Sequence, residues 1–282
     1  MAAITTSVET YIGYTLSGST VPTWTQLDDY IKDGIVDIVN KSILISPGSR
    51  DLFSKWAKNE SATSGTEVPS GLVLEVTREN GTGVAGVVNN ARQISFSEKS
   101  RALDPDSMTY AGKNYPVWYF DEDGSNKRKV VCLPVTSNSD GERYNVRYVH
   151  YSTTDTGGSA LTYASNIDTT PIAFFPISLQ PHLILYCAIR SLYLFIATEM
   201  KKNSKLFDID VDDDDAGNTA ESYIYWLSQE DTEMVQATLT AQQGETAYLV
   251  SYLQKLNSLR MQYDQLFGQA GASREARQKE EV

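Results

Sequence analysis

The acidic segment FDIDVDDDDAGN holds the side chains best suited to bind a metal ion. Counted from Asp210, the residues Asp212 and Asp214 occupy the third and fifth positions of an EF-hand-like calcium loop, and Glu221 occupies the twelfth. The sixth position normally needs glycine for a left-handed turn, and here it is Asp215. The segment is therefore a candidate calcium site, with a solvated acidic loop and a charged contact with a basic partner as the alternatives.

The rest of the sequence offers few groups that could support catalysis. His150 and His182 have no Cys, His or acidic neighbour at a zinc-site spacing, so we interpret both as structural. GTGVAG at residues 81–86 lacks the glycine spacing and the basic anchor of a phosphate cradle, and we interpret it as a hairpin loop. Carboxylates are abundant, but no pair stands out as an acid and base for hydrolysis. We therefore expect no catalytic residues, no cofactor and no enzymatic activity; an enzyme with dispersed carboxylates stays as an alternative.

A third kind of chemistry is offered by the aromatic stretch SRALDPDSMTYAGKNYPVWYF. A proline turn over residues 104–107 leads into Tyr110, Tyr115 and Trp118, followed by two more aromatic residues. These rings could line a carbohydrate groove, form the core of a small β-domain, or meet another protein. The core interpretation is favoured because the rings fall in or beside strand-like segments, while carbohydrate binding would need three rings exposed on one face.

Helical periodicity precedes this stretch. Apolar residues recur at steps of three and four over residues 23–45, with Thr23 as N-cap and Gln26 at the capping-box position. A second, shorter helix is predicted over residues 49–59, where Leu52, Phe53 and Trp56 share a face.

The period then changes to two between residues 72 and 151. Five short runs rich in β-branched and aromatic residues are separated by Gly, Asn and Asp clusters. The runs are LVLEV, ARQISF, YPVWYF, KVVCLPV and YNVRYVHY. They predict a small antiparallel sheet or barrel.

Two long helices are predicted after this region. SLQPHLILYCAIRSLYLFIATEMKK is apolar nearly all round, but its apolar run is short for a membrane span and carries Arg190 at its centre, which indicates a buried core helix. A second helical region over residues 220–267 carries a heptad seam that should pack on helices of the same chain. The seam residues are Leu249, Tyr252, Leu256, Leu259, Tyr263 and Leu266.

Composition limits the possible partners. The chain has 282 residues, a net charge of −12 and 41% hydrophobic residues, which indicates a globular protein with a substantial core. It has no basic cluster that could neutralise a run of phosphates. An acidic surface could instead let DNA slide through a channel without adhering. MAAITTSVET resembles no export signal, and Cys132 and Cys187 are expected to be buried and reduced.

The predicted fold is α+β, a helical bundle formed by N- and C-terminal helices with an inserted small antiparallel β-domain. Residues 1–62 should supply the N-terminal helices, residues 70–152 the β-domain, and residues 176–267 the long C-terminal helices. Residues 268–282 contain no large apolar side chain except the terminal valine, and we expect a flexible tail.

Four segments in this order resemble a known family. RALDPDSMTYAGKNYPVWYF, KVVCLP, YNVRYVHY and FPISLQPHLILYCAIRSL are similar to the pattern of head-to-tail adaptor, or neck, proteins of tailed bacteriophages. That pattern places Ser-x-x-Tyr before a Pro-Val-aromatic-Tyr strand and then a proline-led helix containing Tyr-x-Ala-Ile-Arg-Ser-Leu. The resemblance covers about residues 70–200, and outside this span it rests on the order of the helices. The acidic run has no counterpart in the pattern.

The resemblance implies a structural virion protein that forms a ring, most often of about twelve copies, between the portal protein and the tail nozzle or tail tube. The ring would be assembled in the host cytoplasm, would line the DNA exit channel without sequence-specific contacts, and would contact no membrane. Residues 268–282 would reach onto the portal. The expected interface residues are Tyr110, Tyr115, Trp118, Leu249, Tyr252, Leu256, Arg274 and Arg277. The alternative is another virion structural protein with a carbohydrate-binding β-domain.

Overall fold

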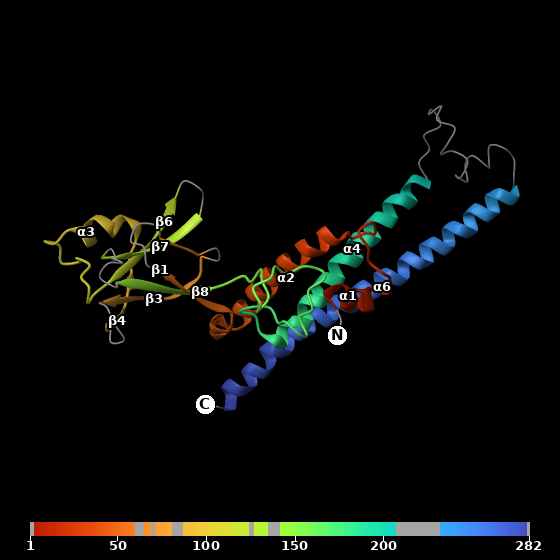
Figure 1. The fold of residues 1–282 in the computed structure, drawn as a ribbon. Helices are drawn as coiled ribbons and strands as arrows, with labels where there is room; N and C mark the ends of the chain where they lie inside the picture. Colours follow the sequence, from red (N-terminus) through yellow and green to blue (C-terminus); the bar gives the residue numbers. More distant parts are fainter. Residues whose placement is uncertain are drawn as a thin grey trace. The chain divides into compact units, whose positions relative to one another are not determined.

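A computed structural model describes residues 3–59, 65–68, 71–80, 87–123, 127–134, 142–206 and 232–280. The fold is α+β, as predicted, with helices and two small sheets (Figure 1). The chain divides into a helical unit and a β-unit. Residues 1–38, 157–171 and 178–282 form the helical unit, and residues 39–156 and 172–177 form the β-unit.

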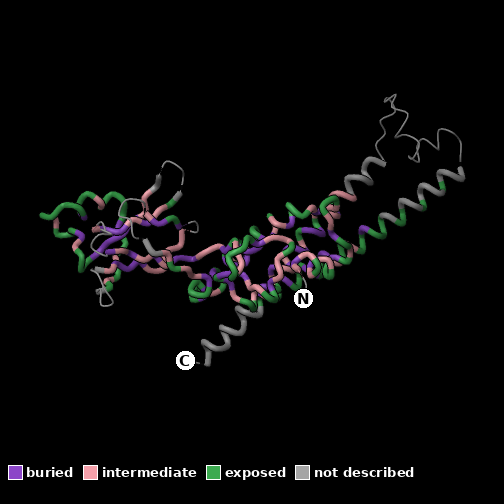
Figure 2. The backbone as a smooth tube through the Cα atoms, in the orientation of Figure 1, coloured by how far each residue is buried: buried purple, intermediate pink, exposed green. Residues whose placement is uncertain are grey.

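The helical unit contains α1 (Ile4–Ile12), most of α2 (Trp24–Ile45), α4 (Gln180–Leu206) and α6 (Thr232–Glu280). A short 3-10 helix, η4 (Ile177–Leu179), precedes α4. Within this unit α4 packs against both α1 and α6. Buried residues, purple in Figure 2, lie along the packed helices. In α2 these are Leu27, Ile31, Ile35 and Ile38, at helical spacing.

The start of α2 is the capping box that the sequence predicts. The Thr23 N–H donates to Gln26 Oε1 at 2.8 Å, and the Gln26 N–H donates to Thr23 Oγ1 at 3.4 Å. The helix ends at Ile45, before Pro47, so both predicted limits are confirmed.

Helix α1 is not predicted from the sequence. Its N-cap is Ala3, which has no side chain to accept a hydrogen bond. A distant loop supplies the acceptors instead: the Ser165 carbonyl accepts from the Ile4 N–H, and the Tyr163 carbonyl accepts from the Thr5 N–H, both at 3.0 Å. This cap cannot be found by reading residues in order along the chain.

Residues Ile177–Glu199 are long and apolar enough to cross a membrane by length and composition, so the expectation that this run is too short for a span is wrong. The core helix of a globular protein meets the same criteria. Here Leu183, Cys187 and Leu192 are fully buried within the helical unit, and the Arg190 guanidinium lies 5.6 Å from the centre of the Tyr30 ring. These contacts support the sequence-based interpretation of α4 as a core helix.

The β-unit consists of two four-stranded sheets. The first has the order β1-β8-β3-β4, and the second has the order β2-β7-β6-β5. Neighbouring strands are antiparallel except for the β5–β6 pair, which is parallel. The strands are β1 (Ser54–Asn59), β2 (Thr66–Glu67), β3 (Val73–Asn80), β4 (Val87–Asn90), β5 (Arg92–Gln93), β6 (Val117–Asp123), β7 (Lys127–Leu133) and β8 (Arg143–Val149).

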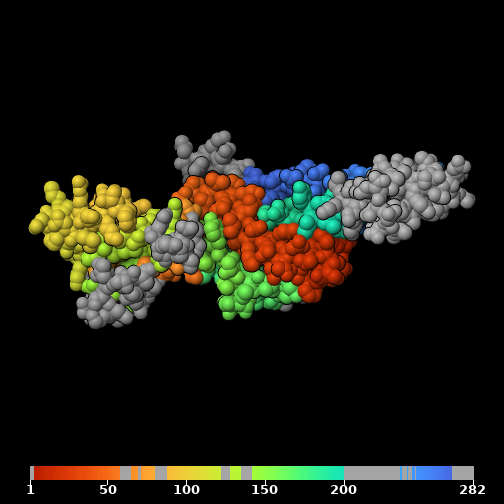
Figure 3. All heavy atoms as spheres, turned by 90° about the horizontal axis from the view of Figure 1, so that it is seen from above, coloured from red at the N-terminus to blue at the C-terminus, as the bar shows by residue number. Residues whose placement is uncertain are grey.

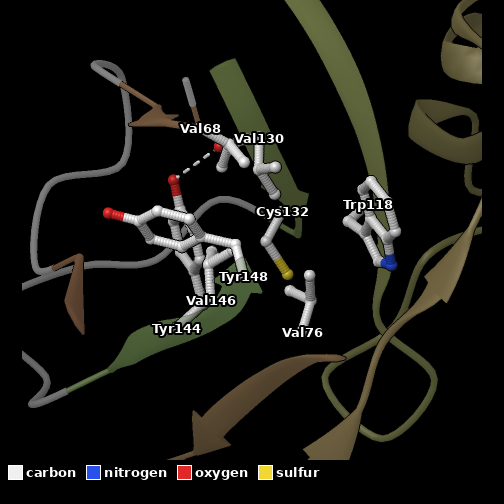
Figure 4. Close-up of a cluster of buried hydrophobic side chains, with 8 residues drawn as sticks. All are labelled: Val68, Val76, Trp118, Val130, Cys132, Tyr144, Val146 and Tyr148. Carbon is white, nitrogen blue, oxygen red and sulfur yellow. Dashed lines mark hydrogen bonds between the residues drawn. The ribbon is translucent and has the colours of Figure 1, made fainter. Parts of the chain in front are cut away.

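Both faces of the second sheet are covered. A cluster with members from both sheets buries one face, and in it the Tyr144 hydroxyl of β8 donates to the Val130 carbonyl of β7 at 3.0 Å (Figure 4). On the other face, η2 (Phe96–Glu98) and α3 (Lys99–Leu103) cover Val117, Tyr119 and Leu133. This double burial explains why the paired halves of these strands, residues 117–120 of β6 and 130–133 of β7, are apolar without interruption.

Three predictions about element limits are corrected. The helix expected over residues 49–59 is a 3-10 helix, η1 (Pro47–Phe53), followed by strand β1. Because β1 pairs with β8, residues up to 59 belong to the β-unit, so the predicted limit of the N-terminal helices at residue 62 is wrong. Of ARQISF, only Arg92–Gln93 is a strand, since Ser95 and Glu98 form a capping box that starts η2.

A fourth correction concerns the C-terminal helix, which ends at Glu280 and not at Phe267. Its last residues are mainly Ala, Gln, Arg and Glu, which are strong helix formers even without an apolar face. The flexibility expected of residues 268–282 stays a prediction. The hairpin loop at residues 81–86 lies outside the described residues, but β3 and β4 on either side of it pair antiparallel.

Both cysteines are buried, Cys132 in β7 and Cys187 in α4. Burial raises the pKa of the Cys132 thiol to about 12, although the charge of Arg78 acts in the opposite direction. Burial likewise raises the pKa of Cys187. Neither thiol is therefore ionised near neutral pH.

Candidate binding site in the β-unit

The loop over residues 104–116 begins with the predicted proline turn. The Ser107 N–H donates to the Asp104 carbonyl at 3.0 Å, and the Asp106 N–H donates to Asp104 Oδ1 at 3.0 Å. Farther along, the Ala111 N–H donates to the Ala102 carbonyl at 2.9 Å. These bonds fix the loop to α3, and Figure 3 shows this region, in yellow, at the surface of the molecule.

Lys113 anchors the far side of the same loop. Its ammonium forms an ion pair with Glu142, and its carbonyl accepts a hydrogen bond from Asn89 Nδ2 at 3.3 Å. Gly112 and Tyr115 form an isolated β-bridge on either side of the turn. The loop is therefore held at its start, in the middle and near its end.

Glu142 connects this loop to the first sheet. Its Oε2 lies 2.7 Å from Arg78 Nη2, and both side chains are buried. Arg78 Nε also donates to the Pro134 carbonyl at 3.2 Å. Burial raises the pKa of Glu142, but the hydrogen bond from Lys113 and the charge of Arg78 outweigh it, so the pKa is lowered overall.

A hollow of about 380 Å³ lies beside the anchored loop; we call it the tyrosine hollow. Pro116 and Val117 are buried residues that line it, together with the more exposed Met108, Tyr110 and Tyr115. Its polar lining residues are Asn90, Arg92, Thr109 and Asn114. Tyr115 is 81% exposed and Tyr110 47%. This lining contains no carboxylate, imidazole or thiol; its hydroxyl groups come from Thr109, Tyr110 and Tyr115.

The aromatic stretch therefore divides into two groups. Trp118 is only 7% exposed and belongs to the core cluster between the sheets (Figure 4), with its ring edge-on to Phe120. Tyr119 is buried on the opposite face of β6. The core interpretation is correct for these residues, and the expectation that Trp118 is an interface residue is wrong. The three exposed rings required for a carbohydrate groove are not present at Tyr110, Tyr115 and Trp118.

The predicted interface residues of α6 also have internal roles. Leu249 and Leu256 are buried, and Tyr252 packs against Phe195 of α4 and Tyr14, with ring centres 5.1 and 6.3 Å away. The seam thus packs within the chain, as the heptad interpretation predicts. The expectation that Leu249 and Leu256 form a surface contact is therefore wrong. Arg274 and Arg277 lie in α6, but their side chains are outside the described part of the chain.

The candidate calcium residues Asp210, Asp212, Asp214 and Glu221 lie outside the described residues. Within the described ranges no group of three or more His, Cys, Asp or Glu residues could hold a metal ion. Burial lowers the pKa of both His150 and His182. His150 lies edge-on to Phe174, and His182 edge-on to Phe267, so both pack against aromatic rings.

The sequence did not identify the polar side of the tyrosine hollow. Asn90 ends β4 and Arg92 starts β5, and the strand pattern gives no reason to group them with a loop more than ten residues away.

No protein-family model, curated protein or solved structure matches the chain.

Proposed function

We propose that this protein is a head-to-tail adaptor that forms a ring between the portal and the tail of a tailed bacteriophage. The observation that carries the proposal is the division of the chain. Segments from both ends build one helical unit, and the β-unit is inserted between them. This is the arrangement implied by the resemblance of residues 70–200 to neck proteins.

The lengths of the helices suit a ring wall. Helix α4 has 27 residues and α6 has 49, so α6 spans roughly 73 Å at 1.5 Å per residue. Several large apolar side chains of this unit remain exposed on the isolated chain, among them Tyr193, Val250 and Met261. Neighbouring copies in a ring would cover such residues.

The charge of the chain suits a DNA conduit. The net charge is −12, which opposes tight binding to the phosphate backbone. Acidic faces turned to the lumen would repel the duplex and let it pass.

Native mass spectrometry of the purified chain, alone and mixed with the portal encoded by the same genome, tests the proposal. We expect a portal-bound multimer with the full chain and none with a chain that ends at Phe267, because the C-terminal residues would reach the portal. An isolated monomer is compatible with the proposal, since the portal can template the ring.

A matched variant separates the length of the helix from its charge. The double variant Arg274→Gln, Arg277→Gln keeps the full length of α6 and removes two positive charges. Weaker portal binding by this variant would assign the contact to the arginines. Absence of portal binding by the full chain at every salt concentration would contradict the adaptor assignment.

A further inference from the structure

We propose that the tyrosine hollow is a docking site for an extended peptide segment that carries a carboxylate. The site follows from the geometry of the β-unit alone; that the segment belongs to a tail component rests on the proposed function. The occupant is argued from the exposed apolar residues, the charge, the strand edges and the anchoring of the loop.

Exposed apolar side chains line the hollow. Met108 is fully exposed, Tyr115 is largely exposed and Tyr110 is about half exposed. Tyrosine, methionine and arginine are enriched at protein interfaces and occur together here. The buried Pro116 and Val117 provide a preformed apolar surface against which a partner side chain could pack.

The charge of the hollow selects a carboxylate. Arg92 is the one charged residue of the lining; its guanidinium forms no direct ion pair among the described residues, although its charge also acts on the exposed Glu98 carboxylate. Guanidinium groups bind carboxylates with two parallel hydrogen bonds. The β-unit has equal numbers of acidic and basic residues, so it does not repel an acidic segment as a whole, and the preference for a carboxylate at this place rests on Arg92.

Two strand edges meet at the hollow, which favours an extended backbone. β4 ends the first sheet and β5 ends the second, and the hollow includes Asn90 from one and Arg92 from the other. Between them the Ala91 N–H donates to the Val76 carbonyl, and the Arg92 N–H donates to the Pro116 carbonyl. Side-chain amides at Asn90 and Asn114 can pair with the peptide groups of an extended segment.

The loop that completes the hollow is fixed before binding. Lys113 is held by Glu142 and by Asn89, and it lies next to Asn114 and Tyr115. A preorganised loop reduces the conformational entropy lost when a partner binds. A saccharide is the competing occupant, and the test includes it.

Display selection of short random peptides on the full chain tests the proposal without any phage protein. We expect enriched sequences to share an Asp or Glu, and fluorescence anisotropy of a labelled winner to show binding weakened about tenfold or more by Tyr115→Ala and Arg92→Gln. The charge reversal Arg92→Glu should change the enriched residue from acidic to basic. Arg101→Glu and Tyr193→Ala, exposed positions outside the hollow, should leave binding unchanged.

Three outcomes overturn the proposal. The first is that no peptide sequence is enriched. The second is that the Arg92→Glu variant still enriches acidic peptides. The third is that peptides do not bind, whereas glycans from a panel bind the native chain and no longer bind Tyr115→Ala. Because the selection needs no portal, it can succeed when the portal experiment fails, and the reverse also holds. Circular dichroism and thermal unfolding of each variant verify that the β-unit is intact.

Discussion

The hydroxyl of Tyr263 in α6 donates a hydrogen bond of 2.7 Å to Asp37 Oδ2 in α2. Burial and this bond to an acceptor carboxylate raise the pKa of Tyr263, so the phenol stays protonated and remains a donor. The bond joins residues 226 positions apart in the sequence. It connects the C-terminal helix to the N-terminal part of the helical unit.

Replacement of Tyr263 by Phe should therefore destabilise the helical unit. Loss of a hydrogen bond to a charged group costs about 1.5 kcal/mol in the free energy of unfolding. Urea denaturation followed by circular dichroism measures it. Tyr193→Phe is the control, because Tyr193 is exposed on α4, and its effect should be within about 0.5 kcal/mol. Equal effects of both substitutions would remove the role assigned to Asp37.

Gly34→Ala should also destabilise the chain, although alanine has a higher helix propensity than glycine. A Cβ at Gly34 would lie 2.7 Å from Leu183 Cδ1 and 2.8 Å from Tyr186 Cδ1, so these two side chains of α4 would have to shift. We expect a loss of about 1–3 kcal/mol. Gly244→Ala in α6 is the matched control, since nothing lies within 4 Å of its Cβ position, and it should gain about 0.5–1 kcal/mol. A stabilising Gly34→Ala would show that the helices are not this close.

Leu256→Ala should lower stability and not merely disturb assembly. Leu256 is 6% exposed in the α6 seam, whereas Leu253 on the same helix is 39% exposed. Truncation of the buried leucine should cost about 2–4 kcal/mol and that of Leu253 much less. Thermal unfolding of the isolated chain measures both. The opposite order would return Leu256 to an interface role.

Glu142→Gln should destabilise the β-unit and flatten its dependence on pH. The substitution removes the carboxylate charge that Glu142 presents to the buried Arg78 guanidinium and to Lys113, which costs about 3 kcal/mol at neutral pH. The pKa of Glu142 lies below its ordinary value of 4.5, so at low pH the unfolded chain binds more protons at this site than the folded chain. The stability that Glu142 contributes is therefore complete above that value and is lost as pH falls through the folded-state pKa.

Urea midpoints measured between about pH 7 and pH 3 should show this slope for the native chain and a smaller slope for Glu142→Gln. Glu98→Gln serves as a comparison on the surface. Hydrogen bonds from Ser95 lower the pKa of Glu98, but that carboxylate is fully exposed. A native slope that Glu142→Gln leaves unchanged would assign the acid sensitivity to other carboxylates.

Periodicity was sufficient to predict the elements whose signals are local. Thr23 and Gln26 lie within one helical turn, and the buried face of α2 repeats at helical spacing. The strand sequences around Trp118 and Val146 are likewise apolar enough to identify. The α+β class followed from these segments and their order.

Elements that depend on distant partners could not be predicted. Phe53, which ends η1, and Trp56 in β1 lie at a spacing that also suits a helix, and only pairing with β8 makes Ser54–Asn59 a strand. The cap of α1 comes from residues 163–165. In the candidate site, Tyr110 and Tyr115 were identified by residue type, whereas Arg92 was not, because a parallel pair with β6 brings it there.

The burial of both cysteines has a practical consequence for studies of this protein in solution. Maleimide dyes react with thiolates, and neither Cys132 nor Cys187 supplies one near neutral pH while the chain is folded. A cysteine introduced at the fully exposed Met108 would then be the fast-reacting thiol of the whole sequence. A single fluorophore could be attached beside the tyrosine hollow without removing either native cysteine, and its emission would report directly on what enters.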